Sequence, residues 1–292
     1  MKLQKDYYDF VLVVGNGFDL NLGLETGYVH FLNSENFKNL IDSSNKLARY
    51  LADQFALQNW IDVENELRNY AEKIQQKMED LHSDFKELSS ALKDFLSSLD
   101  YEIINKNSLA YSLIGEFKEG NLLIIDFNYT PTVGIILNEL KARGELKSEI
   151  EHIKIHGSIE ENDIIFGIED GARIPSKYVF LKKSSNKNFY AVDFSMAIDG
   201  CKDFALFGHS LGETDQMYFK DFFMNAYSKQ KKDENQHFIF FHYGEMEYYK
   251  LLAQIDRLTL QNITKLKLKN NVHFVDSIKA QQKLDTKMAS LN

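Results

Sequence analysis

Short apolar runs and long amphipathic stretches alternate along the chain and predict its elements. Seven short runs, rich in β-branched and aromatic residues, are typical of strands. They lie at residues 11–14, 122–125, 153–155, 164–166, 204–207, 238–241 and 272–275. The first run, Val11-Leu12-Val13-Val14, is uniformly apolar and stops at a glycine, which is typical of a buried strand in a parallel sheet.

From about Glu35 to Phe117 the pattern changes to the three-and-four spacing of amphipathic helices. Apolar residues follow this spacing at Leu47, Tyr50, Leu51, Phe55, Phe85, Leu88, Leu92, Phe95, Leu96 and Leu99. The stretch has almost no Gly and no Pro, so it predicts several helices with short breaks near Asn59 and at Leu81–Asp84. A further helix is predicted after the second strand, with Thr130 as N-cap, Pro131 at the first helical position and Gly144 beyond the last turn.

Strands that alternate with helices predict an α/β protein with a Rossmann-like, mostly parallel sheet. The helical stretch after the first strand is longer than a normal crossover, so it is interpreted as an insertion. The predicted domains are a nucleotide-binding core of residues 1–34 and 118–292 and a helical insertion of residues 35–117.

Composition narrows the class of protein. The chain has 292 residues, 44% hydrophobic and 26% charged, with one cysteine and a net charge of −9. Cys201 alone cannot form an internal disulfide or a four-cysteine zinc site, and this usage fits a reducing cytoplasm. No apolar run approaches the ~20 residues that span a bilayer, so a cytoplasmic protein without membrane contact is expected. The acidic balance disfavours nucleic acid as a partner but allows a small phosphorylated ligand.

Four predicted strands end in polar or glycine-rich clusters, which the sequence places at Gly15–Asp19, Phe127–Thr130, His156–Ser158 and Gly208–Ser210. In an open parallel sheet, ligands bind beyond the carboxyl ends of the strands. If the strands are parallel, all four clusters face one crevice. The sequence therefore predicts a nucleotide-binding site at this edge of the sheet.

Gly15-Asn16-Gly17 follows the first strand directly and allows a phosphate to approach the backbone closely. The alternative is a plain tight turn between strand and helix. The segment is not the dehydrogenase fingerprint, because Leu20 occupies the position of the third glycine. A second-strand acidic residue is also missing, so hydride transfer is disfavoured.

Two strand-end side chains are candidates for catalysis. The Asn128 amide can orient a water or a ribose hydroxyl, or it can satisfy its own turn before Pro131. The His156 imidazole can act as a general base near neutral pH, although a histidine at a strand end is more often structural.

The predicted ligand-binding residues come from two of the clusters: Gly15, Asn16, Gly17, Asp19, Gly208, His209, Ser210 and Asp215. Asp215 can instead cap a helix. The role of Trp60 and Glu64 stays open, with a solvated helix glutamate the interpretation favoured for Glu64. Gly208–Gly212 superficially matches a nucleophile elbow around Ser210, but His237, His242 and His273 offer no convincing triad partner. No metal-ligand spacing occurs, so no metal is predicted.

Taken in order, these clusters resemble the AbiH family of phage abortive-infection proteins. The resemblance rests on residues 13–28, Trp60 with Glu64, and the segments 127–130, 155–157, 166–168 and 207–215. A more distant similarity, to sirtuin-like NAD-binding domains, implies that Asn128 and His156 serve the nicotinamide-ribose end of NAD. Two departures stand out: one cysteine cannot build the sirtuin zinc ribbon, and Glu25 replaces a proline often found in the first loop.

The resemblance implies an antiphage protein that hydrolyses NAD at the nicotinamide–ribose bond, with no cofactor beyond this substrate. The alternative is a non-catalytic sensor of NAD, ADP-ribose or a related nucleotide that signals through the helical insertion. A toxic NAD-consuming enzyme must be silent before infection, so an unidentified phage trigger is expected. A homo-oligomer is left open.

Overall fold

The structure is a computed structural model that describes residues 3–5, 7–58, 62–117, 120–146, 149–190, 194–212, 214–228 and 236–289. The chain divides into two compact units. The first unit comprises residues 1–24, 103–155 and 191–292, and the second comprises residues 25–102 and 156–190. Of the predicted insertion, residues 35–102 lie in the second unit and residues 103–117 in the first.

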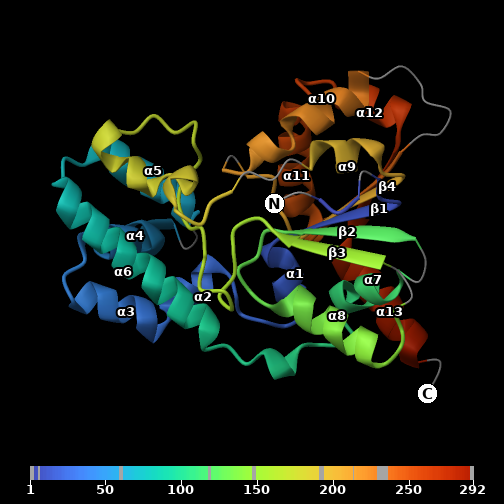
Figure 1. The fold of residues 1–292 in the computed structure, drawn as a ribbon, viewed down its shortest axis with the longest axis horizontal. Coiled ribbons are helices and arrows are strands. Elements are labelled where there is room, and N and C mark those ends of the chain that lie inside the picture. Colours follow the sequence, from blue (N-terminus) through green and yellow to red (C-terminus); the bar gives the residue numbers. More distant parts are fainter. Residues whose placement is uncertain are drawn as a thin grey trace. The chain divides into compact units, whose positions relative to one another are not determined.

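The first unit is built on a six-stranded sheet whose neighbouring strands all pair in parallel (Figure 1). Its strands are β1 (Phe10–Val14), β2 (Asn121–Asp126), β3 (Glu149–Lys154), β4 (Asp203–Phe207), β5 (His237–His242) and β6 (Asn271–Asp276). Their order is β3-β2-β1-β4-β5-β6, so β1 lies between β2 and β4. The predicted Rossmann-like fold class is confirmed.

Six of the seven predicted strands match this sheet. The strand predicted at 164–166 is wrong, because this segment lies in the second unit and forms no ladder. The amide of Ile165 donates to the carbonyl of His156, and the neighbouring Ile168 forms only an isolated bridge with Lys182. An apolar run of three residues is too short to distinguish a strand from a buried loop.

Helices cover both faces of the sheet, which explains why β1 is uniformly apolar. In Figure 1, α9 (Ser195–Gly200), α10 (Lys220–Ser228) and α12 (Ile263–Lys269) lie on one face, and α1 (Asn16–Asn21), α7 (Leu109–Gly115), α8 (Thr132–Ala142) and α13 (Ser277–Ala289) on the other. Val11 and Val13 join the core beneath the first group, together with residues of α11 (Gly244–Leu258). Leu12 and Val14 are also fully buried, as expected for a parallel strand covered on both sides.

The start of α8 differs from the prediction by one residue. Pro131 is the N-cap and makes no side-chain cap hydrogen bond, so Thr130 is not the cap. The hydroxyl of Thr130 is instead bound to Asp19, and this tertiary contact replaces the local one. Gly144, with φ +69°, follows the C-cap Arg143 as predicted.

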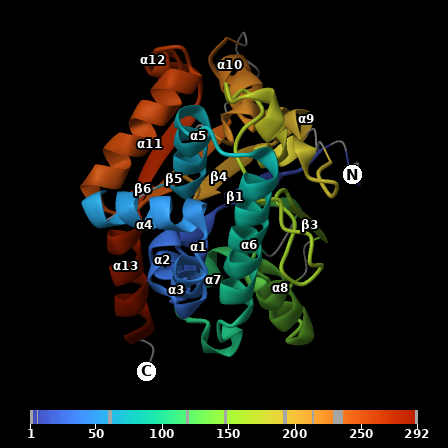
Figure 2. The same cartoon turned by 90° about the vertical axis from the view of Figure 1, so that its left-hand side faces the viewer.

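The second unit is mainly helical (Figure 2). Its helices are α2 (Tyr28–Asn33), α3 (Glu35–Asp42), α4 (Lys46–Gln58), α5 (Val63–Lys73) and α6 (Met78–Ser97), and residues 156–190 add the 3₁₀ segments η2 (Ser176–Leu181) and η3 (Lys183–Ser185). A third 3₁₀ segment, η1, spans Tyr101–Ile103. The predicted break at Leu81–Asp84 is wrong, because α6 continues through it and buries Leu81, Leu88 and Leu92 on one face.

Candidate functional site

The loops that follow β1 and β4 are in direct contact at the carboxyl edge of the sheet. The Gly15 amide donates to the carbonyl of Phe207 at 3.1 Å, and the Gly17 amide donates to the carbonyl of Gly208 at 2.9 Å. A Cβ atom on Gly17 would lie 2.6 Å from the Gly208 Cα, and Gly208 itself has φ +69°. Glycine is therefore required here by the packing of one loop on the other.

This contact also occupies backbone donors that a phosphate would use. The amides of Gly15 and Gly17 are bound across the loops, and the Phe18 amide donates to the carbonyl of Gly15 at 2.8 Å. The alternative that Gly15–Gly17 is a plain tight turn is therefore supported by these hydrogen bonds. Nucleotide binding at Gly15, Asn16 and Gly17 stays a prediction, and Asn16 is exposed.

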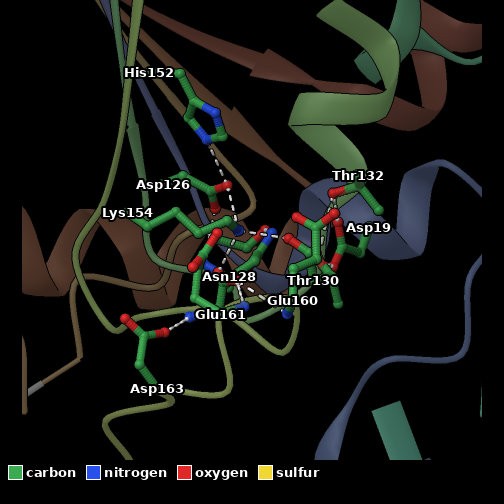
Figure 3. Close-up of polar contacts among 12 residues, drawn as sticks. Asp19, Asp126, Asn128, Thr130, Thr132, His152, Lys154, Glu160, Glu161 and Asp163 are labelled. Carbon is green, nitrogen blue, oxygen red and sulfur yellow. Dashed lines mark hydrogen bonds and ion pairs between the residues drawn. The ribbon is translucent and has the colours of Figure 1, made fainter. Parts of the chain in front are cut away.

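Asp19 lies in α1 and is only 1% exposed. One carboxyl oxygen accepts a hydrogen bond from the Thr130 hydroxyl and the other from the Thr132 hydroxyl, each at 2.6 Å (Figure 3). Burial raises the pKa of Asp19 to about 6, although the two hydroxyls partly oppose this effect. Asp19 therefore connects α1 to the loop that carries Asn128.

Asn128 is 7% exposed, and its side chain reaches across to the first loop. Its Nδ2 donates to the carbonyl of Gly15 at 3.1 Å, so the side chain does not merely satisfy its own turn. Its backbone amide donates to Asp126 at 2.9 Å. The structure thus brings together two of the predicted site residues, Asn128 and Gly15, and fixes the plane of the amide group.

Sequence reasoning missed an ion pair that supports this loop. Asp126 is fully buried and contacts the Lys154 Nζ and the His152 Nε2, each at 2.9 Å (Figure 3). Lys154 also donates to the backbone carbonyls of Asn128, at 2.8 Å, and Thr130. Burial alone would raise the pKa of Asp126, but Lys154 and His152 outweigh it and lower that pKa below its ordinary value. The available signal was a lysine between Ile153 and Ile155, at the end of β3.

The loop after β4 holds the remaining predicted binding residues. His209 is 8% exposed, and its Nε2 lies 3.4 Å from a carboxyl oxygen of Asp215. Its Nδ1 accepts from the Leu211 amide at 3.0 Å. Asp215 is the N-cap residue of the short 3₁₀ segment η4 (Gln216–Tyr218) but makes no side-chain cap hydrogen bond, and its carboxyl group faces the histidine. Ser210 is exposed beside them.

His156 belongs to the second unit, where it is 4% exposed and contacts the buried side chain of Lys183. Its Nε2 is 3.4 Å from the Nζ of Lys183, and that Nζ is 3.0 Å from a carboxyl oxygen of Glu64. Glu64 is 8% exposed, so the solvated interpretation favoured for it is wrong. Trp60 lies outside the described residues. Lys183 was not found from the sequence, because no local pattern distinguishes it from its neighbour Lys182.

A metal-binding cluster and a membrane-spanning helix were sought among the described residues. No group of three or more His, Cys, Asp or Glu side chains there could hold a metal ion. None of the helices there combines the length and the apolarity that crossing a bilayer requires.

The strand order and the polar loops at the strand ends define a Rossmann-like α/β protein. The family model described as bacteriophage abortive infection AbiH matches residues 11–119 and 68–243. These matches cover most of the chain, which therefore belongs to the AbiH family. No curated protein matches it.

Proposed function

We propose that this abortive-infection protein binds NAD at the carboxyl ends of β1 and β4 and hydrolyses its nicotinamide–ribose bond. The observation that carries the proposal is the strand order. With β2 and β3 on one side of β1 and β4 to β6 on the other, the order reverses between β1 and β4. Dinucleotides bind at this reversal in Rossmann folds, and the Gly15 and Gly208 loops meet here.

The reaction consumes one water and converts NAD into nicotinamide, ADP-ribose and a proton. Its transition state resembles an oxocarbenium ion, so the protein contributes mainly by positioning. In this proposal the Oδ1 of Asn128 accepts a hydrogen bond from the attacking water or from a ribose hydroxyl. The bond from Nδ2 to the Gly15 carbonyl supports this role, because it holds the amide in one orientation before substrate arrives.

In this proposal the predicted binding residues have different roles in ligand binding. Asn16 and Ser210 are exposed and offer side-chain groups to the ligand. Gly15, Gly17 and Gly208 allow the two loops to approach each other. Asp19, His209 and Asp215 are engaged with other protein groups and support the loops.

The test follows nicotinamide release from NAD by purified protein, with and without extract of phage-infected cells as a source of the trigger. Asn128→Ala should lower kcat about 100-fold, the order of a lost positioning contact. Asn138→Ala, in an exposed position on α8, is the matched control and should leave kcat unchanged. His156→Ala tests the other predicted catalytic residue separately. Thermal unfolding of each variant verifies that it is folded.

Equal release by wild type and Asn128→Ala would remove Asn128 from the mechanism. A calorimetric signal for NAD or ADP-ribose, without nicotinamide release in the presence or absence of the extract, would contradict hydrolysis and indicate the nucleotide sensor instead.

A further inference from the structure

The second unit contains a buried chain of three ionisable side chains: Glu64, Lys183 and His156. Their contacts are 3.0 Å between Glu64 and Lys183 and 3.4 Å between Lys183 and the His156 Nε2. Burying charge is costly unless it is paired, so a lysine that contacts both a carboxylate and an imidazole in the interior requires a reason.

The segment Phe166-Gly167-Ile168 places the lysine. Gly167 has φ +153°, and a Cβ atom there would lie 2.3 Å from the carbonyl oxygen of Leu181. The Ile168 amide donates to that carbonyl at 2.8 Å, and the Lys183 amide donates to the Ile168 carbonyl at 2.9 Å. These bonds fix the backbone of Lys183. The glycine and its neighbours therefore serve to present this ammonium group.

A lysine ammonium donates hydrogen bonds and accepts none. The His156 nitrogen that faces it must therefore be the unprotonated one, which leaves the ring proton on Nδ1. The ammonium also opposes a positive charge on the ring, and the Glu64 carboxylate keeps the lysine charged. We propose that the Glu64–Lys183 pair holds His156 neutral as the Nδ1–H tautomer, so that His156 works as a hydrogen-bond donor and not as a general base.

Other charged groups bonded close to these residues have partners of their own. Arg68, one turn along α5 from Glu64, pairs with Glu169 at 2.9 Å. Asp163 accepts from the Ser158 amide at 2.7 Å. Lys183 contacts the His156 ring directly, and Glu64 acts on the ring through its ion pair with Lys183.

The tautomer follows from contacts inside the second unit, whereas its catalytic consequence rests on the proposed NAD hydrolysis. Glu64 and Lys183 are positioning residues in this scheme. A reaction that used His156 as a base would lose rate as pH falls through the ordinary histidine pKa of about 6.5. If His156 is neutral from pH 6 to pH 8, the rate of nicotinamide release should not fall with pH in this range through protonation of His156.

The experiment is two-bond ¹H–¹⁵N NMR of the histidine rings in the full-length protein, with the His156 signals assigned by their loss in His156→Gln. We expect the Nδ1–H pattern for His156 from pH 6 to pH 8. His30 is the internal control from the same unit, because its Nδ1 accepts from the Gly27 amide at 3.2 Å and its proton must be on Nε2. Lys183→Met should raise the pKa of His156 by about one unit or more, while Lys183→Arg should preserve the wild-type pattern.

An Nε2–H pattern for His156 in the wild-type protein, or titration of its ring near pH 6.5, would overturn the inference. Both results come from the wild-type protein, so they do not depend on whether a variant folds. Absence of nicotinamide release together with the Nδ1–H pattern would contradict the proposed function and leave the tautomer inference standing.

Discussion

In the first unit the buried carboxyl group of Asp19 is satisfied by two threonine hydroxyls, whereas in the second unit the buried carboxylate of Glu64 meets the ammonium group of Lys183. Hydroxyls stabilise a carboxylate but do not neutralise it, so burial dominates and the pKa of Asp19 is raised to about 6. The first unit also contains the opposite case. Asp126 has the ammonium group of Lys154, and its pKa is lowered.

The comparison teaches that burial alone does not determine the state of a carboxyl group. A group held by hydroxyls can change protonation close to neutral pH, while a group held by a cation stays ionised and makes the protein depend on that cation. The two arrangements should therefore respond differently to mutation and to pH.

The largest effect is expected for Lys183→Met, which leaves the Glu64 carboxylate buried without its ammonium partner. Removing one member of a buried ion pair costs about 3–5 kcal/mol in the free energy of unfolding, measured here by urea denaturation at pH 7. The control is Lys38→Met, which breaks the exposed pair with Glu35 and should cost about 0–1 kcal/mol. The double variant Glu64→Gln/Lys183→Met should recover most of the loss. Equal destabilisation by Lys183→Met and Lys38→Met would mean that the buried pair contributes no more to the free energy of unfolding than the exposed pair.

A somewhat smaller effect is expected from pH, through Asp19. Its folded pKa of about 6 exceeds the ordinary value of 3.8, so between these values the folded protein binds more protons than the unfolded chain. Stability contributed by protonated Asp19 is therefore present at about pH 4 and is lost as pH rises through about 6. About two pKa units correspond to about 3 kcal/mol. Asp19→Asn should remove this component, so its unfolding free energy should fall less between pH 4 and pH 7 than that of the wild type. Parallel curves for the two proteins would refute the assignment.

The smallest of the three effects is expected for Thr132→Val, which removes one of the two hydroxyls that donate to Asp19. A lost hydrogen bond to a charged group costs about 1.5–3 kcal/mol at pH 7, and less at pH 4.5, where Asp19 is protonated. Thr286→Val, which removes an exposed hydroxyl of α13, should change the unfolding free energy by less than about 0.5 kcal/mol at both pH values. A cost that is equal at both pH values would show that Thr132 does not act through the charge of Asp19.

Much of the first unit could be predicted from sequence because its signals are local. A run such as Val11–Val14 must be buried on both faces, and the turn residues beside it mark where the strand ends. The same argument placed the Asn128 and Gly15 loops at one edge of the sheet, since parallel strands bring their carboxyl ends together, and the contact between them agrees with it.

The contacts that define the polar clusters could not be predicted in this way. Thr130 has the sequence signature of a helix cap, but its hydroxyl binds Asp19. Glu64 resembles any exposed helix glutamate in sequence, yet it is buried against Lys183. In both cases the partner is distant in the chain, and no periodicity carries information about which distant polar group will be its neighbour.

By itself, the sequence determined the alternation of strands and helices, the parallel sheet and the glycine loops at its edge, because burial of apolar runs and backbone freedom at glycine are properties of short segments. Only the tertiary structure decided which polar groups meet in the interior. That choice depends on desolvation and pairing between remote residues, which arise when the chain has folded and water has been excluded.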